Sequence, residues 1–402
     1  MHINWYKTFV YLVFPGYFFY HALRSWVDLP YVGWFSVFIM AAVGVFGAKA
    51  FRSILSGNTK TNVSALLITS VFWLMMILIS AMIALHHLLD PQPYMGTDGL
   101  MWSISIVVWT IGFYLIGQNT NTKPTKYGGP LFFFTTILFC ALTYAFYQSS
   151  SGTVELTLIN YQSGELANYQ GIARSVIFMA LLFLPFIESK TIKSVYFLTY
   201  LIMLYFIGSR SDLILMLSIV PFFIYFNYGI LSGLITSLAS IAAIPLAIFL
   251  ELGVADRYSF MTAQDASLDE RSKLLEKGFQ GIINSPIAGD YLGQVRDFDG
   301  TGYYIHNALS MWQAFGLLPF LMYTALLVLS LLTALSFLFN GKKTGLNESL
   351  FYVSFICIVA VIASKSITWA LPALAWGMAY KSFRDCQIPV KRPADKNLEQ
   401  NT

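Results

Sequence analysis

Long apolar stretches alternate with short polar segments along nearly the whole chain. A helix that crosses the hydrocarbon core of a bilayer needs about 20 mostly apolar residues. Stretches that meet or approach this length occur at residues 5–23, 31–50, 63–87, 100–118, 130–148, 171–188, 194–208, 213–228, 230–250, 304–339, 348–364 and 367–383. The pattern therefore predicts an all-α integral membrane protein with about 12 transmembrane helices.

The polar segments between these spans predict the orientation of the chain. Lys and Arg residues accumulate in cytoplasmic loops. With the amino terminus inside, 15 of the 24 Lys and Arg residues lie on the cytoplasmic side, and the opposite orientation reverses this bias at nearly every loop. We therefore expect both ends of the chain to lie in the cytoplasm.

Composition supports a membrane protein over a soluble one. Of the 402 residues, 57% are hydrophobic and 11% are charged, and the mean hydropathy is +0.64. Soluble domains carry about 25% charged residues. We therefore expect the lipid bilayer as a partner, and no nucleic acid. The three cysteines argue against a disulfide framework, since two of them fall in apolar spans.

The spans divide the chain into four parts. Residues 1–250 hold the first nine spans, residues 251–303 form one long external loop, residues 304–383 hold the last three spans, and residues 384–402 form a polar tail that we expect to be disordered. Within the loop, residues 267–279 show the apolar periodicity of an amphipathic helix lying along the membrane surface. Asn284-Ser285-Pro286 ends this pattern, and a glycine-rich, irregular remainder follows.

Nine basic residues remain outside, against the usual bias. Four are arginines at span edges or in the long loop: Arg174, Arg210, Arg257 and Arg271. Because a guanidinium binds phosphate oxygens in pairs, these arginines indicate an anionic ligand at the external face. Each also has a structural interpretation. Arg210 can form a local pair with Asp212, Arg271 can belong to a solvated helix face, and Arg174 and Arg257 can be interfacial anchors.

His306 and Asn307 open the tenth span, directly after the long loop. Histidine accepts a proton near neutral pH, which makes His306 the best candidate for a general base. The alternative is an interfacial histidine that hydrogen-bonds to water or to a backbone carbonyl. Tyr303 and Tyr304 precede it, and are candidates either for stacking on sugar rings or for an interfacial aromatic belt.

One short acidic motif in the loop is typical of a different chemistry. Asp297-Phe298-Asp299 resembles the paired acids that hold a divalent metal in soluble nucleotide-sugar transferases. Such donors are used in the cytosol, whereas this loop is predicted to be external. We therefore expect neither a metal nor another cofactor.

The order of the motifs resembles that of the O-antigen polymerase/O-antigen ligase superfamily of bacterial inner-membrane glycosyltransferases. The resemblance rests on Ser209-Arg210 between two short spans, on Arg271 followed by Pro286-Ile-Ala-Gly289, and on His306-Asn307-Ala-Leu309 followed by Gly316. These motifs cover roughly residues 208–320. The family often has Gly-x-x-Gly after the His-Asn motif, whereas this chain has Pro319, which is expected to kink the helix.

The resemblance implies a GT-C-like polytopic glycosyltransferase with one long periplasmic loop. Its donor would be an undecaprenyl-pyrophosphate-linked oligosaccharide, used at the periplasmic face of the inner membrane. His306, Arg210 and Arg271 would be catalytic, and the substrate would contact Arg174, Asn307, Arg257, Tyr303 and Tyr304. The expected partners are a chain-length regulator and a flippase of the same pathway.

Three functions remain open on these residues. An O-antigen polymerase transfers the glycan onto another lipid-linked repeat unit, and a ligase transfers it onto lipid A–core. A secondary transporter, or a flippase or structural partner of polysaccharide assembly, is the alternative of another class. The halves of the chain lack matching broken helices, and most of the external chain is one loop, which favours an enzyme over a transporter. The abundance of Phe and Tyr, at 34 and 24 residues, modestly favours a polymerase.

Overall fold

The computed structural model describes residues 4–27, 34–55, 62–89, 96–120, 128–148, 153–154, 169–249, 266–298, 304–340 and 344–385. Within these ranges the only strands are β1 (Tyr147–Gln148) and β2 (Thr153–Val154), which pair antiparallel. The first half of the bundle contains α1 (Trp5–Arg24), α2 (Trp34–Leu55), α3 (Val63–Leu89), α4 (Gly96–Gln118), α5 (Gly128–Phe146), α6 (Tyr169–Phe183) and the short 3-10 helix η2 (Leu184–Phe186). The second half contains α7 (Lys190–Ile207), α8 (Arg210–Ser218), α9 (Val220–Tyr228), α10 (Ile230–Phe249), α14 (Leu317–Phe339), α15 (Gly345–Ala363) and α16 (Leu371–Asp385).

The described residues include eight helical segments that are long and apolar enough to cross a membrane. They are Val63–Leu89, Gly99–Gln118, Gly129–Phe146, Tyr169–Phe186, Lys190–Ile207, Arg210–Tyr228, Leu317–Phe339 and Gly345–Ala363. The chain is therefore an all-α, multi-pass membrane protein, as its hydropathy predicts. The other four predicted spans coincide with helices α1, α2, α10 and α16.

Proline and glycine mark the points where two of the predicted spans divide into separate helices. Pro221 stands in the first turn of α9, directly after α8 ends. The helix that begins the tenth predicted span is also broken, but the break lies at Gly316 between α13 (Leu309–Phe315) and α14. The predicted kink at Pro319 is wrong. Pro319 lies in the first turn of α14, where a backbone N–H has no helical partner to lose.

α16 forms the centre of the bundle. Residues 371–379 are all buried, and Trp376 is among the largest side chains that are fully enclosed. α16 packs against α4 backbone to backbone, because a Cβ on Gly377 would overlap the carbonyl of Tyr114 and a Cβ on Gly117 would overlap that of Leu374. Small residues at such crossings are typical of helix pairs in membranes.

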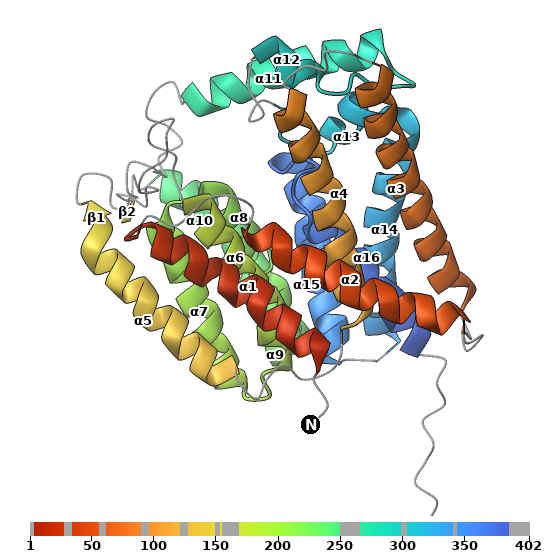
Figure 1. Ribbon diagram of the computed structural model, residues 1–402. Coiled ribbons are helices and arrows are strands. Elements are labelled where there is room, and N and C mark those ends of the chain that lie inside the picture. The colour runs from red at the N-terminus through yellow and green to blue at the C-terminus, as the bar shows by residue number, and fades with distance from the viewer. Residues whose placement is uncertain are drawn as a thin grey trace, which may run out of the picture.

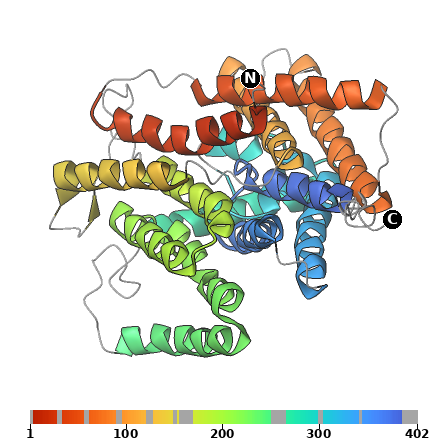
Figure 2. The ribbon, with the colours of Figure 1, turned by 90° about the horizontal axis from the view of Figure 1, so that it is seen from below.

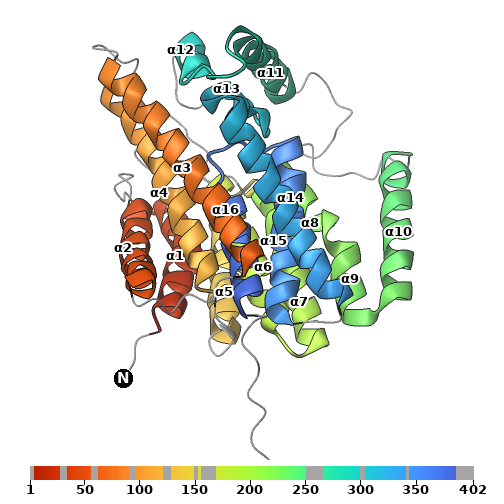
Figure 3. The same cartoon turned by 90° about the vertical axis from the view of Figure 1, so that its right-hand side faces the viewer.

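The remaining helices close one end of the bundle. α11 (Ala266–Asn284) and α12 (Gly293–Phe298) lie across this end, with α13 below them (Figure 1). The start of α1 and the end of α16 lie at the opposite end, and α10 stands at an edge of the bundle (Figure 3). Viewed along the bundle, α1 and α2 form the edge opposite α10 (Figure 2). The amphipathic helix predicted over residues 267–279 runs from Ala266 to Asn284 and ends at the predicted Asn284-Ser285-Pro286 break, whereas α12 was not predicted.

Candidate functional site

A tight turn between α7 and α8 presents the first candidate residues. Gly208 ends α7 with a φ of 76°, a left-handed conformation that glycine adopts at little cost. The hydroxyl of Ser209 donates a hydrogen bond of 2.6 Å to Oδ2 of Asp212, which is 1% exposed. Arg210 is the first residue of α8 and is half-buried. The turn therefore holds a buried carboxylate beside an arginine.

Lys365 pairs with this carboxylate. Its Nζ lies 2.9 Å from Oδ1 of Asp212 and donates a longer hydrogen bond of 3.4 Å to the hydroxyl of Ser211. The backbone N–H of Lys365 donates to the carbonyl of Ala360, which holds the residue against the end of α15. Arg210 is the partner of Asp212 expected from the sequence, and Lys365 was not predicted as a site residue. The one available signal was its place among the external basic residues.

The His306 segment is attached to the same end of α15. The N–H of Ala308 donates to the carbonyl of Val361 at 2.6 Å, and the hydroxyl of Ser310 accepts from the N–H of Ile367 at 3.1 Å. The ring of Tyr304 lies 4.9 Å from that of His306, centroid to centroid. These contacts place the half-buried imidazole beside the loop that carries Lys365.

The electrostatics of His306 link three distant parts of the chain. Burial, followed by the positive charges of Arg271 and Lys365, lowers the pKa of the imidazole from 6.5 to about 4. Arg271 comes from α11, Lys365 from the segment after α15, and His306 from the segment before α13. At neutral pH this histidine is uncharged and able to accept a proton, and it lies in a positive field that attracts an anion.

Two glycines join α11 to α13. The N–H of Leu317 donates to the carbonyl of Ile287 at 3.2 Å, and the indole N–H of Trp312 donates to that of Pro286 at 2.7 Å. Gly289 and Gly316 have φ values of 78° and 80°, and a Cβ on either would overlap the backbone of the facing segment. The two motifs that contain these glycines therefore interlock, which fixes the helix carrying Arg271 against the helix that follows His306.

The structure gives only part of the surroundings of the other predicted site residues. Oδ1 of Asn307 accepts a hydrogen bond of 2.9 Å from the N–H of Leu309, so this oxygen caps the first turn of α13. Contact with substrate would then use its amide nitrogen. Arg174 is half-buried on α6, and its Nε has no hydrogen-bond partner among the described residues. Arg257 and Tyr303 lie outside the part of the chain that the structure describes.

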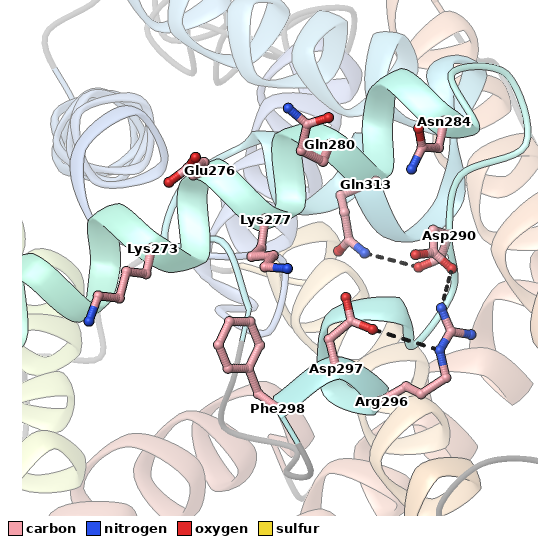
Figure 4. Close-up of a pocket in the computed structure, with 11 residues that line it drawn as sticks. Lys273, Glu276, Lys277, Gln280, Asn284, Asp290, Arg296, Asp297, Phe298 and Gln313 are labelled. Atoms are coloured by element: carbon pink, nitrogen blue, oxygen red, sulfur yellow. Dashed lines mark hydrogen bonds and ion pairs between the residues drawn. The ribbon is translucent and has the colours of Figure 1, made fainter.

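A cavity of about 710 Å³ opens between α11 and α12. Figure 4 shows Lys277 of α11 and Phe298 of α12 projecting into this space. Arg296 lies 3.4 Å from Oδ1 of Asp290 and 4.0 Å from Oδ1 of Asp297. Asp297, the first acid of the metal-like motif, thus contacts a guanidinium, and Asp299 falls outside the described residues. Over the described ranges, no group of three or more His, Cys, Asp or Glu side chains is placed to hold a metal ion.

Tyr291, in the loop after α11, packs inside the protein. It is 7% exposed, and its hydroxyl contacts the hydroxyl of Ser103 and lies 3.4 Å from Nε2 of His87. Its ring lies 4.8 Å from that of His86. Tyr291 therefore joins the loop after α11 to the ends of α3 and α4, where the two histidines also lie.

Comparison with known proteins assigns no family. No protein-family model matches this chain, and no curated protein matches it. One solved structure, described by the words "Structural coordination of polymerization and crosslinking by a peptidoglycan synthase complex", aligns with a TM-score of 0.41 and 12% sequence identity, over 79% of this chain and 98% of that chain. A likeness of this degree establishes neither a shared family nor a shared activity.

Proposed function

We propose that this protein is a glycosyltransferase that polymerises a lipid-linked surface polysaccharide of the O-antigen type. The observation that supports this most directly is the uncharged imidazole of His306 in the field of Arg271 and Lys365. This combination offers a proton acceptor and an anion site side by side, which a pyrophosphate-linked donor requires. In this proposal the chain crosses the bacterial inner membrane twelve times, both ends lie in the cytoplasm, and the site faces the periplasm.

The reaction would proceed by displacement at the anomeric carbon. A hydroxyl oxygen of the acceptor sugar forms a bond to C1 of the donor sugar, the bond between C1 and the phosphate oxygen breaks, and undecaprenyl pyrophosphate leaves with the electron pair. The proton of the hydroxyl passes to His306. Arg210 and Arg271 stabilise the negative charge that develops on the leaving phosphate, with Arg174 as a weaker third. Lys365 acts through Asp212, which it holds in the turn beside Arg210.

Binding of the donor would also prepare the base. A pKa of about 4 leaves His306 uncharged but weakly basic in the free protein. A pyrophosphate bound against the arginines brings negative charge close to the imidazole, and negative charge raises the pKa of a histidine. His306 would therefore become a stronger base once the donor is in place.

The deciding experiment is transfer by purified protein. The protein is incubated with a lipid-linked repeat unit alone, beside His306→Ala and Arg210→Ala variants, and the glycans are separated on a gel. A ladder that both variants lose supports the polymerase. Transfer only after lipid A–core is added identifies a ligase that uses the same residues. No transfer to either acceptor rejects the enzyme and favours a transporter or flippase.

A further inference from the structure

We propose that the cavity between α11 and α12 binds sugar residues of the glycan, next to the sugar that reacts. This inference rests on the proposed function, because it assigns a second part of the same substrate. The reacting hydroxyl and the pyrophosphate would occupy the cluster of His306, Arg271 and Lys365. The cavity would hold the oligosaccharide that extends from it.

The cavity shares its walls with the two elements that bear the reacting groups. Gln313 lines it from α13, the helix that follows His306. Lys277 and Gln280 line it from α11, the helix that carries Arg271. Gln313 is the fifth residue of α13, which begins three residues after His306. At a rise of 1.5 Å per helical residue, Lys277 lies about 9 Å along α11 from Arg271. A short oligosaccharide spans such a distance.

α11 presents separate faces to the two parts of this site. A buried row on α11 contains Leu274, Gly278 and Ile282 at spacings of four residues. Arg271, three residues before Leu274, lies on the same side of the helix. Lys273, Lys277, Gln280 and Asn284 line the cavity and lie on a different side of the helix. One helix can therefore contact phosphate near His306 while its other side contacts sugar.

The chemistry of the lining suits sugar better than phosphate. Three basic and three acidic side chains line the cavity: Lys273, Lys277, Arg296, Glu276, Asp290 and Asp297. Arg296 already contacts two of the carboxylates, so the cavity carries little net attraction for an anion.

Sugar hydroxyls both donate and accept hydrogen bonds, and the carboxylates, amides and ammonium groups of this lining offer both kinds of partner. The ring of Phe298 adds one flat apolar surface for the C–H face of a sugar. The side chain of Gln313, which is 4% exposed, donates a hydrogen bond of 3.0 Å to the carbonyl of Asp290. This bond holds two lining residues of the cavity together. The volume lies within the range of about 300–1,000 Å³ that small-molecule sites occupy.

The test uses a glycan that cannot act as donor. The repeat-unit oligosaccharide, released from the lipid-linked pool of the host by mild acid, lacks the pyrophosphate. Its binding to the purified full-length protein is followed by saturation-transfer NMR in the wild type, in Gln280→Ala, in Phe298→Ala and in Ser272→Ala. Ser272 is exposed on α11 and does not line the cavity, so it is the matched control.

We expect each cavity variant to weaken binding by roughly five- to tenfold, the effect of one lost contact, and Ser272→Ala to bind as the wild type does. His306→Ala should still bind the oligosaccharide, since it removes only the base. Equal binding by wild type and both cavity variants would overturn the proposal. Oligosaccharide binding that depends on Gln280 and Phe298, in a protein that transfers no glycan, would uphold the cavity and reject the polymerase.

The same variants separate acceptor from donor. In transfer assays, the free oligosaccharide competes with whichever glycan the cavity holds. If the cavity holds the acceptor glycan, Gln280→Ala raises both the inhibition constant of the oligosaccharide and the KM for the repeat unit. If it holds the growing donor chain, Gln280→Ala raises the inhibition constant, leaves the KM for the repeat unit unchanged and shortens the product ladder. An unchanged ladder with unchanged constants would reject both assignments.

Discussion

The imidazole of His306 shows how single residues set the chemistry of this site. Burial and two cations keep it uncharged at a pH where an isolated histidine is partly protonated. One of these cations, Lys365, forms an ion pair with the buried carboxylate of Asp212, which neutralises its charge in part. The proton affinity of the proposed base therefore depends on Lys365 as well as on Arg271.

This dependence predicts a pH effect. The value of kcat/KM for transfer falls at low pH as His306 becomes protonated. This fall, the acid limb of the pH profile, should lie near pH 4 in the wild type. Lys365→Met removes a positive charge and leaves Asp212 unpaired, and both changes raise the pKa of His306. The acid limb should move up by roughly one unit or more toward 6.5.

The measurement is the pH profile of transfer rate at low substrate concentration. Lys190→Met is the control, because Lys190 is exposed at the start of α7. An acid limb that does not move in Lys365→Met, or that lies at pH 6.5 in the wild type, would contradict the assignment of His306 as a base between two cations.

At the scale of the element, α11 combines an apolar edge with its polar and buried faces. Leu275, Phe279 and Ile283 recur every four residues and are 40%, 49% and 56% exposed. Leu318, the second residue of the apolar helix α14, is also exposed, at 51%. We expect a helix with this pattern to lie in the membrane interface with its apolar edge in lipid.

Spin labels test this placement. In proteoliposomes, labels at positions 275, 279 and 283 should be relaxed mainly by oxygen, which concentrates in hydrocarbon. Labels at positions 276, 280 and 284 should be relaxed mainly by a water-soluble nickel chelate. Equal accessibility to the nickel chelate at all six positions would place α11 in water.

The interlock between α11 and α13 predicts a second effect at this scale. Gly316→Ala places a methyl group against the carbonyl of Ile287, at a φ that alanine disfavours. We expect a loss of about 1–3 kcal/mol in stability and a larger loss of activity, because Arg271 and His306 would shift relative to each other.

The thermal midpoint in detergent and the rate of transfer measure both effects. Gly47→Ala is the matched control, since a Cβ at Gly47 meets nothing within 4 Å in the interior of α2. Alanine there should be neutral or slightly stabilising. Equal behaviour of the two variants would show that the interlock is unimportant.

At the scale of the whole molecule, the bundle brings His306, Arg271, Lys365 and Asp212 to one end. The start of α1 and the end of α16 lie at the other end, so the proposed topology puts α11 and α12 in the periplasm (Figures 1 and 3). The tight contact of α4 with α16 at Gly117 and Gly377 holds the centre together. A site assembled from α8, α11, α13 and α15 requires this rigid arrangement.

Cysteine labelling measures the orientation. In a background without Cys140, Cys357 and Cys386, Ser272→Cys should react with a membrane-impermeant maleimide in intact spheroplasts. Lys190→Cys should react only after the membrane is opened. The reverse result would place the proposed site in the cytoplasm and reject a periplasmic reaction. Both positions are exposed, so a difference in labelling reports the side of the membrane.

The sequence by itself determined the helices and their membrane character. Hydropathy is a local property, so runs such as residues 63–87 and 348–364 predict spans without knowledge of their neighbours. The amphipathic helix of the long loop and its end near Pro286 were also visible, because periodicity and proline act within a few residues. His306 and Arg271 were selected by residue type and by their predicted side of the membrane.

Only the tertiary structure decided which of these residues meet. The pair of Lys365 with Asp212, the interlock of Gly289 with Gly316 and the packing of Tyr291 against two histidines all join segments far apart in the chain. Such contacts depend on how helices cross and which backbones approach, and neither hydropathy nor spacing records this. The place of a break in the tenth span was likewise set by the fit of Gly316 against the loop at Ile287, and not by the proline three residues later.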